Sequence, residues 1–195
     1  MISAGVSVPS STRLLADRLS AALGAALDGE DLDVVHVELR EHAHALADAL
    51  LTGFPPASLA ESVRAVESAD AVIAVTPVFS ASYSGLFKSF VDVLDKEALR
   101  GTPVLVGATA GTPRHSLVLE HAMRPLFSYL GALVVPTGVF AATEDFGQRG
   151  LDERIARAAG ELAGLLEQRP PAPPPADFTG VVPFPELLRG ASEPS

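Results

Sequence analysis

Two hydrophobic periodicities alternate along the chain, and this alternation limits the possible folds more than any other feature. Short runs rich in β-branched residues, which favour strands, occur at 33–39, 71–75, 103–107 and 133–135. Amphipathic segments with helical spacing lie at 12–27, 58–68, 84–94, 114–130 and 152–168. This repetition predicts an α/β fold with a parallel sheet and right-handed crossovers. Runs 71–75 and 103–107 are nearly all apolar, which indicates helices on both faces of the sheet.

Charge and composition exclude several classes of function. The 195 residues include 14 Lys and Arg against 24 Asp and Glu, a formal net charge of −10 that opposes binding to nucleic acid. The absence of cysteine excludes disulfides, thiolate metal ligands and cysteine nucleophiles. The chain shows neither a signal-peptide pattern nor an apolar run of about 18 residues. We therefore expect a soluble, cytoplasmic protein with no membrane contact.

The proline content divides the chain in two. We expect residues 1–168 to form one domain and 169–195 to form a proline-rich C-terminal extension. Segment 169–175 reads Arg-Pro-Pro-Ala-Pro-Pro-Pro, which cannot continue a helix. Segment 181–188 is apolar, so we expect it to dock on the domain or on a second copy of the chain.

Ligands of doubly wound sheets bind outside the carboxyl ends of the strands, which directs attention to the loops there. The first loop, at 4–13, carries hydroxyls on Ser7, Ser10, Ser11 and Thr12 just before a long helix. The positive end of that helix dipole would favour a phosphate. The alternative is that Ser10 or Ser11 only caps the helix.

Two further loops follow the most apolar runs. The loop at 76–88 combines Pro77, small residues at 80–85 and the aromatic side chains of Phe79 and Tyr83, which suits a flat ligand. The alternative is a turn before a helix that begins near Ser84. In the loop at 108–115, backbone N–H groups suit ligand carbonyl or ring nitrogen atoms. The alternative there is a tight turn in which Thr112 caps a helix and Pro113 takes its first position.

Taken together, these loops resemble a known family. The residues are Thr-Pro-Val-Phe-Ser-Ala-Ser-Tyr-Ser-Gly-Leu-Phe-Lys-Ser-Phe-Val-Asp at 76–92 and Ala-Thr-Ala-Gly-Thr-Pro-Arg-His at 108–115, extended by 119–132. They are similar to the NAD(P)H-dependent FMN reductases of the flavodoxin-like superfamily. The resemblance runs from the N-terminus to about Gly147 and is strongest to the reductase components of two-component flavin monooxygenases. It implies a five-stranded parallel sheet in the order 2-1-3-4-5 with helices on both faces.

The resemblance also assigns roles to residues. It implies that the FMN phosphate is bound by Ser10, Ser11 and Thr12, with Ser7 as a further candidate. It implies that the ribityl chain and ring lie on Pro77, Val78, Phe79 and Ser82. The backbones of Gly111 and Thr112 would approach the pyrimidine end of the ring. Val6 stands where many relatives have a phosphate-loop Ser, so any contact there must come from the backbone.

The implied activity is NAD(P)H-dependent reduction of FMN, with reduced flavin supplied to a monooxygenase partner. Alternatives are a flavodoxin-type electron carrier and a flavin-dependent quinone or azo reductase. Hydride passes directly between nicotinamide and flavin, so we expect no catalytic residue and no metal. His121 stands where substrate-flavin reductases carry an inserted helix residue, often Tyr or His. It is either a modulator of flavin exchange or a residue of a subunit interface.

Several questions stay open at this point. Arg13 and Arg114 are both candidates for a coenzyme 2′-phosphate, so the choice between NADPH and NADH is not decided. Whether flavin is a tightly bound cofactor or a substrate is not decided either. The resemblance implies a homodimer or tetramer. His42 and His44 make a poor metal pair on a helix, and Lys88 suits an ion pair as well as a flavin contact.

The first strand is unusually short. Only Met1 to Ala4 precedes the first loop, whereas a typical strand has about 5–6 residues. An internal strand this short would leave the neighbouring strands, at Val34 and Val72, without partners. From this we expect Met1 to be a misassigned or engineered start.

Overall fold

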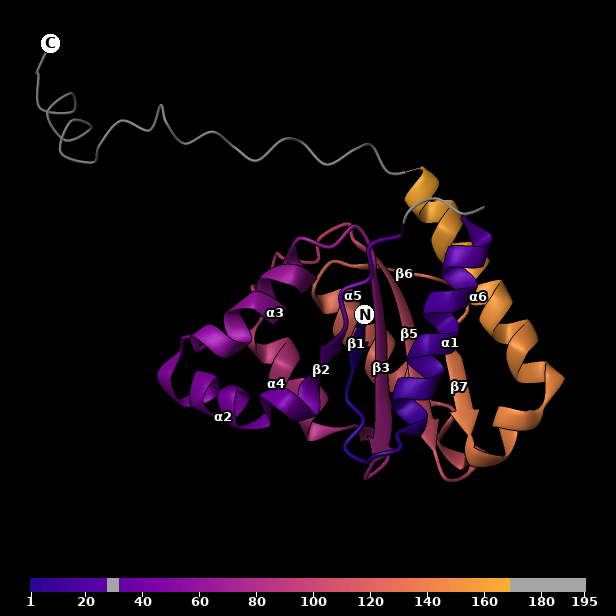
Figure 1. Ribbon diagram of the computed structural model, residues 1–195, viewed down its shortest axis with the longest axis horizontal. Coiled ribbons are helices and arrows are strands. Elements are labelled where there is room, and N and C mark those ends of the chain that lie inside the picture. The colour runs from indigo at the N-terminus through magenta and orange to yellow at the C-terminus, as the bar shows by residue number, and fades with distance from the viewer. Residues whose placement is uncertain (28–31, 169–195) are drawn as a thin grey trace, which may run out of the picture.

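The strands form one mainly parallel sheet between two layers of helices in the computed structural model, which describes residues 1–27 and 32–168 (Figure 1). The sheet strands are β1 (Ile2–Ser3), β2 (Val37–Glu38), β3 (Val72–Phe79), β5 (Pro103–Ala110), β6 (Leu133–Val134) and β7 (Val139–Ala142). They follow the order β2-β1-β3-β5-β6, with β7 also paired to β5. The predicted α/β class and the order 2-1-3-4-5 are confirmed. The C-terminal extension and its expected docking segment lie outside the described residues, and the division at 168 stays a prediction.

The number of strands differs from the prediction, because the sheet has seven strands instead of five. The fifth position is shared by β6, which pairs at Val104, and β7, which pairs from Gly107 onward. Between them lies Pro136, which has no N–H to offer a ladder. The remaining addition is β4 (Ser82–Tyr83), which pairs antiparallel with the end of β3.

The helices are α1 (Ser11–Ala26), α2 (Ala43–Thr52), α3 (Ala57–Glu67), α4 (Gly85–Val93), α5 (Arg124–Tyr129) and α6 (Arg149–Glu167). Short 3-10 turns occur at η1 (Leu39–His42), η2 (Pro113–His115) and η4 (Thr143–Gly147), and η3 (Leu119–Met123) is a π-helical turn. Helix α2 was not predicted. The predicted helix at 114–130 is divided into η2, η3 and α5.

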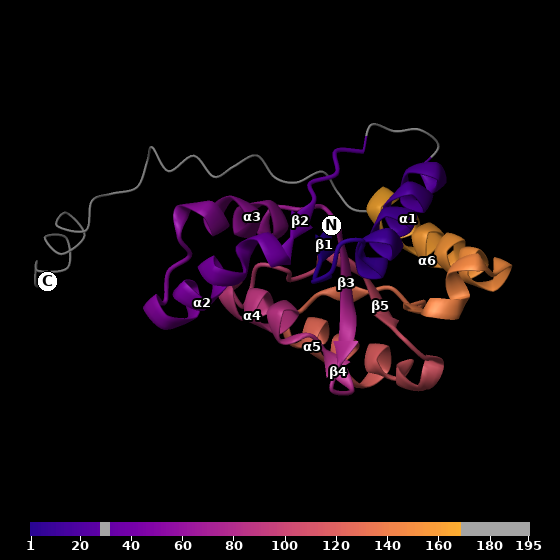
Figure 2. The ribbon, with the colours of Figure 1, turned by 60° about the horizontal axis from the view of Figure 1, so that its bottom comes forward.

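The helices lie on both faces of the sheet (Figure 2), and each helical layer encloses its own hydrophobic core. Helices α1 and α6 cover one face of the sheet, where Leu15, Leu19 and Ile155 pack against Val75 and Leu105. Helices α2 to α5 cover the other face around the fully buried rings of Phe87, Phe90 and Phe127. Leu14 lies in the segment 12–27 that was predicted to be an amphipathic helix, but it is 44% exposed and does not join the core.

Strand β1 is short but paired on both sides. Ile2 aligns with Val37 and Ala74, and the Met1 ammonium donates to the Val35 carbonyl at 2.7 Å. At this end of the sheet a cavity of about 1070 Å³ is lined by Met1, Val35 and residues of α1, α3, β3 and α6. Burial there lowers the pKa of the Met1 ammonium to about 6, because a charged group loses its water.

No helix in the described ranges combines the length and the apolar character needed to cross a membrane.

Candidate functional site

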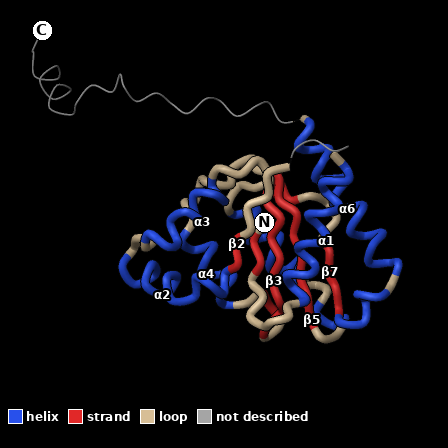
Figure 3. The backbone as a smooth tube through the Cα atoms, viewed as in Figure 1, coloured by secondary structure: helices blue, strands red, loops and turns tan. Residues whose placement is uncertain are grey.

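The loops that follow β1, β3 and β5 lie side by side at the carboxyl edge of the sheet, at the lower edge of the strands in Figure 3. They have to meet because the three strands are parallel neighbours. One buried contact joins the first loop to the third: the hydroxyls of Thr12 and Thr109 are 2.8 Å apart. The fold therefore brings the predicted phosphate and ring segments to one place.

The first loop leads directly into α1. Ser10 is the N-cap, and its hydroxyl accepts a hydrogen bond from the Arg13 N–H at 3.2 Å. In the described chain the N–H groups of Ser11 and Thr12 have no partner, as expected for the first turn of a helix. A Cβ at Gly5 would lie 2.0 Å from the Ser10 hydroxyl oxygen, so only glycine permits this approach. The loop thus presents two free donors at the positive end of a helix dipole.

The predicted phosphate ligands differ in what they expose. The Thr12 side chain is buried against Thr109, so its backbone N–H, not its hydroxyl, is the group that can face a ligand. The exposed Ser11 carries its hydroxyl at the helix start. Ser7 donates to the Pro9 carbonyl at 3.0 Å, within its own loop. The capping interpretation is confirmed for Ser10, whose hydroxyl keeps its own hydrogen for a further acceptor.

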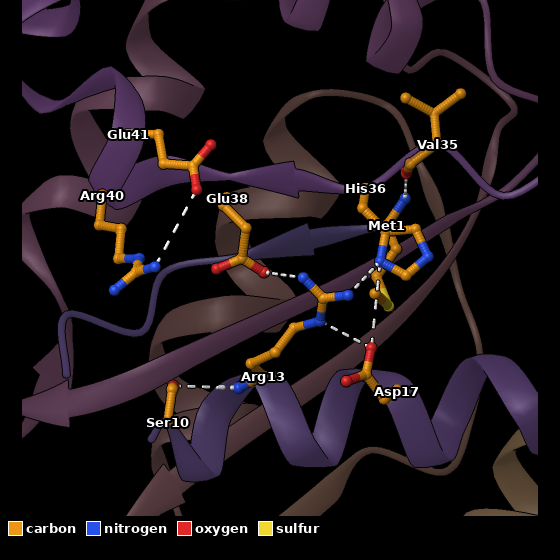
Figure 4. A network of polar contacts seen from close by, with 9 residues as sticks. All are labelled: Met1, Ser10, Arg13, Asp17, Val35, His36, Glu38, Arg40 and Glu41. Atoms are coloured by element: carbon orange, nitrogen blue, oxygen red, sulfur yellow. Dashed lines mark hydrogen bonds and ion pairs between the residues drawn. The ribbon is translucent and has the colours of Figure 1, made fainter. Parts of the chain in front are cut away.

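Arg13 is held in a network with three side chains (Figure 4). Its guanidinium donates to Asp17 and Glu38, each at 2.7 Å, and lies 2.6 Å from the Nδ1 atom of His36. The hydrogen bond to Asp17, followed by the one to Glu38, raises the pKa of Arg13. This network ties α1 to β2. Arg13 is therefore already engaged, and of the two arginines proposed for a coenzyme phosphate it is the less available.

The second loop is a hairpin that extends β3. Val78 pairs with Tyr83 and Phe79 with Ser82. The turn uses Ser80 and Ala81 at φ of 49° and 65°, a left-handed conformation that is uncommon outside glycine. Pro77, Val78 and Ser82 are partly buried, whereas the Phe79 ring is 47% exposed. The hairpin thus offers an aromatic surface next to the first loop.

The alternative for this loop also holds in part. Ser84 caps α4 by accepting from the Phe87 N–H at 3.2 Å, and its own N–H donates to the Thr76 hydroxyl at 3.0 Å. Lys88 donates to Asp92 at 2.7 Å, so its role is an ion pair along α4. These contacts anchor the hairpin without using Phe79 or Ser82.

From Gly111 onward, the third loop exposes its residues to solvent. Gly111 and Thr112 are both exposed, and a Cβ added to Gly111 would meet nothing within 4 Å. Pro113 does take the first position of η2, but the Thr112 side chain makes no capping hydrogen bond, so that part of the alternative was wrong. The space above Gly111 is free for a ligand.

A smaller cavity of about 350 Å³ lies between the hairpin and the start of η3. It is lined by Ala81, Ser82, Arg114, His115, Leu117, Val118, His121 and Ala122. His121 belongs to the π-helical turn, and π-turns often occur at functional sites. The other two basic residues of this cavity, Arg114 and His115, are the last two residues of the third loop. In the part of the chain that the structure describes, no cluster of metal-binding side chains occurs.

Comparison with known proteins decides the family. A family model for NADPH-dependent FMN reductases matches residues 1–147. The chain belongs to this family. An FMN reductase (NADPH) from Pseudomonas aeruginosa is 40% identical over 173 residues, which cover 86% of this chain and 91% of that protein. The NADH-dependent FMN reductase SfnE of Pseudomonas putida is 40% identical over 158 residues, or 81% of each chain.

A solved structure agrees with these relatives. An oxidoreductase from Corynebacterium diphtheriae superposes with a TM-score of 0.84 at 52% identity, covering 87% of this chain and 96% of that one. The predicted family, the oxidoreductase class and the use of FMN with NAD(P)H are confirmed. The relatives are named for NADPH in one case and NADH in the other, so family membership leaves the coenzyme open.

Proposed function

We propose that the three loops bind FMN at the carboxyl edge of the sheet and that the chain releases the reduced flavin to a monooxygenase. The phosphate would be held by the Ser10 and Ser11 hydroxyls and by the free N–H groups of Ser11 and Thr12. Two backbone donors at a helix N-terminus, neither with a partner among the described residues, fit a dianion. This fit is the structural support for FMN in this family member.

The ring would lie between the second and third loops. Pro77, Val78, Phe79 and Ser82 would form one side of the ring site, and the exposed backbone of Gly111 and Thr112 would reach the pyrimidine end. FMN supplies the redox chemistry by accepting hydride from the nicotinamide. The protein orients the ring and leaves one face open. The ring of Tyr83 packs 6.0 Å from the buried Phe87 ring, which is consistent with that open face.

The observation that supports the release of flavin is the π-helical turn that contains His121. This exposed side chain lines the same cavity as Ser82 in the hairpin. A residue on a π-turn next to the ring site is well placed to weaken the hold on flavin. We therefore favour flavin as an exchangeable substrate over flavin as a permanently bound cofactor.

Substitution of His121 tests this idea. His121→Ala should change the amount of FMN that survives gel filtration and should slow NADPH oxidation when free FMN is the acceptor. The exposed Ser128→Ala, on the following helix, serves as control. Identical flavin content and turnover in the His121 variant and the wild type would contradict a role in flavin exchange and favour the alternative, a residue of a subunit interface.

The identity of a monooxygenase partner, the cytoplasmic location and the homodimer or tetramer stay predictions. Size-exclusion chromatography coupled to light scattering decides the last of these.

A further inference from the structure

The cavity of about 350 Å³ beside the hairpin has an unusual charge. Its lining includes Arg114, His115 and His121 and, among the residues that the structure describes, no carboxylate. The whole chain carries a formal charge of −10. A carboxylate-free pocket with a permanent cation is therefore a local exception in an acidic protein, and it favours an anion.

Arg114 has no partner within residues 1–27 and 32–168. Its guanidinium makes no hydrogen bond and no ion pair there. The acidic residue nearest in sequence is Glu120, which binds Arg124 instead, with Nε and Oε2 2.9 Å apart. That pair also lowers the pKa of Glu120, so this carboxylate is already committed to a cation. The charge of Arg114 thus faces the cavity uncompensated.

We propose that this cavity binds a phosphate monoester dianion, the 2′-phosphate of NADPH, with Arg114 as its main ligand and His115 beside it. The inference rests on the proposed function, because the nicotinamide must reach a ring held by the neighbouring Ser82 and Phe79. The planar guanidinium offers paired donors that match phosphate oxygens. The volume suits a phosphate with part of its ribose, at the lower end of typical ligand pockets.

The network around Arg13 strengthens the choice. The Arg13 guanidinium already contacts Asp17, Glu38 and His36, whereas no described residue accepts a hydrogen bond from the Arg114 guanidinium. Only the second arginine can bind a phosphate without first breaking an ion pair. The structure therefore favours NADPH over NADH.

The decisive variant is Arg114→Gln, measured with both coenzymes at saturating FMN. Loss of hydrogen bonds to a charged group should lower kcat/KM for NADPH roughly 10- to 100-fold and leave the value for NADH within about twofold. Arg114→Lys keeps the charge and should recover part of the loss. The matched control is Arg157→Gln on α6, which removes an arginine that is also exposed and also has no hydrogen bond or ion pair to any described residue.

Binding without turnover separates this inference from the proposed function. Adenosine 2′-monophosphate should bind the wild type more tightly than adenosine does, and Arg114→Gln should abolish the difference in calorimetry. An equal loss for NADPH and NADH would assign the cavity to the shared pyrophosphate and overturn the proposal. Unchanged kinetics with both coenzymes would overturn it as well. A wild type that binds the 2′-phosphate but does not reduce FMN would contradict the proposed function alone.

Discussion

Replacing Gly111 by valine separates flavin binding from folding. A Cβ at this exposed position meets no atom within 4 Å, so the free protein has room for the larger side chain. We expect the free energy of unfolding to change by no more than about 0.5 kcal/mol, as for most surface substitutions. The same side chain would occupy the space proposed for the pyrimidine end of the ring.

The expected loss of affinity follows from the ring surface. An aromatic group that buries about 150–250 Å² at roughly 25 cal/mol per Å² gains about 4–6 kcal/mol. If the valine displaces the ring from half of that contact, the loss is about 2–3 kcal/mol. This corresponds to at least a roughly 30-fold weaker binding of FMN.

Two measurements check this prediction. Quenching of FMN fluorescence gives the dissociation constant, and thermal unfolding gives stability. Gly164→Val is the control, because Gly164 also has open space around its Cβ but lies on α6. An unchanged dissociation constant in Gly111→Val, with full flavin occupancy, would refute the placement of the third loop in the site.

Two other regions give predictions of their own. Ser10→Ala combined with Thr12→Ala should weaken FMN binding at least about tenfold, because the Ser10 hydroxyl is lost as a donor to the dianion, whereas the Thr12 hydroxyl is already bound to Thr109. The double variant should also lower the free energy of unfolding, because Ser10 caps α1 and the Thr12 hydroxyl binds that of Thr109. Glycine at an N-cap lowers helix stability only slightly, so an FMN titration of Ser10→Gly measures the effect on binding alone. The Met1 ammonium has a pKa of about 6 against 8.0 in the unfolded chain, so the unfolded state binds more protons between these values. Unfolding free energy should therefore rise by about 2 kcal/mol from pH 6 to pH 8 in denaturant titrations, and an apolar extension ahead of Met1 should remove this dependence and raise the melting temperature.

Unchanged FMN affinity in both Ser10 variants would contradict the proposal that the phosphate binds at the N-terminus of α1. A flat stability profile between pH 6 and pH 8 would contradict the burial of the Met1 ammonium.

The sheet could be predicted from sequence wherever burial alone decides the pattern. Strands β3 and β5 are buried on both faces and read as continuous apolar runs. The hairpin could not be predicted, because its turn places Ser80 and Ala81 in a left-handed conformation without glycine or asparagine. The divided fifth strand was missed because its second half, β7, pairs only after the break at Pro136.

For the site, too, the sequence showed what neighbouring residues determine but not which distant residues come into contact. Hydroxyls, glycine and aromatic residues after the strands drew attention to three loops that the fold brings together at the carboxyl edge of the sheet. The burial of Thr12 against Thr109 was not visible, since the contact joins residues 97 positions apart. The cavity with Arg114, His115 and His121 was missed for a related reason, because it depends on a hairpin and a π-helical turn that only the folded chain brings together.

Reduction of FMN by this chain is tested most directly by the anaerobic oxidation of NADPH by the purified protein, with and without added FMN. We expect oxidation to depend on added FMN and one NADPH to bleach one FMN, with loss of the yellow colour in step with the coenzyme absorbance. If NADPH oxidation is absent with FMN, or equally fast without it, the chain does not use FMN as the acceptor.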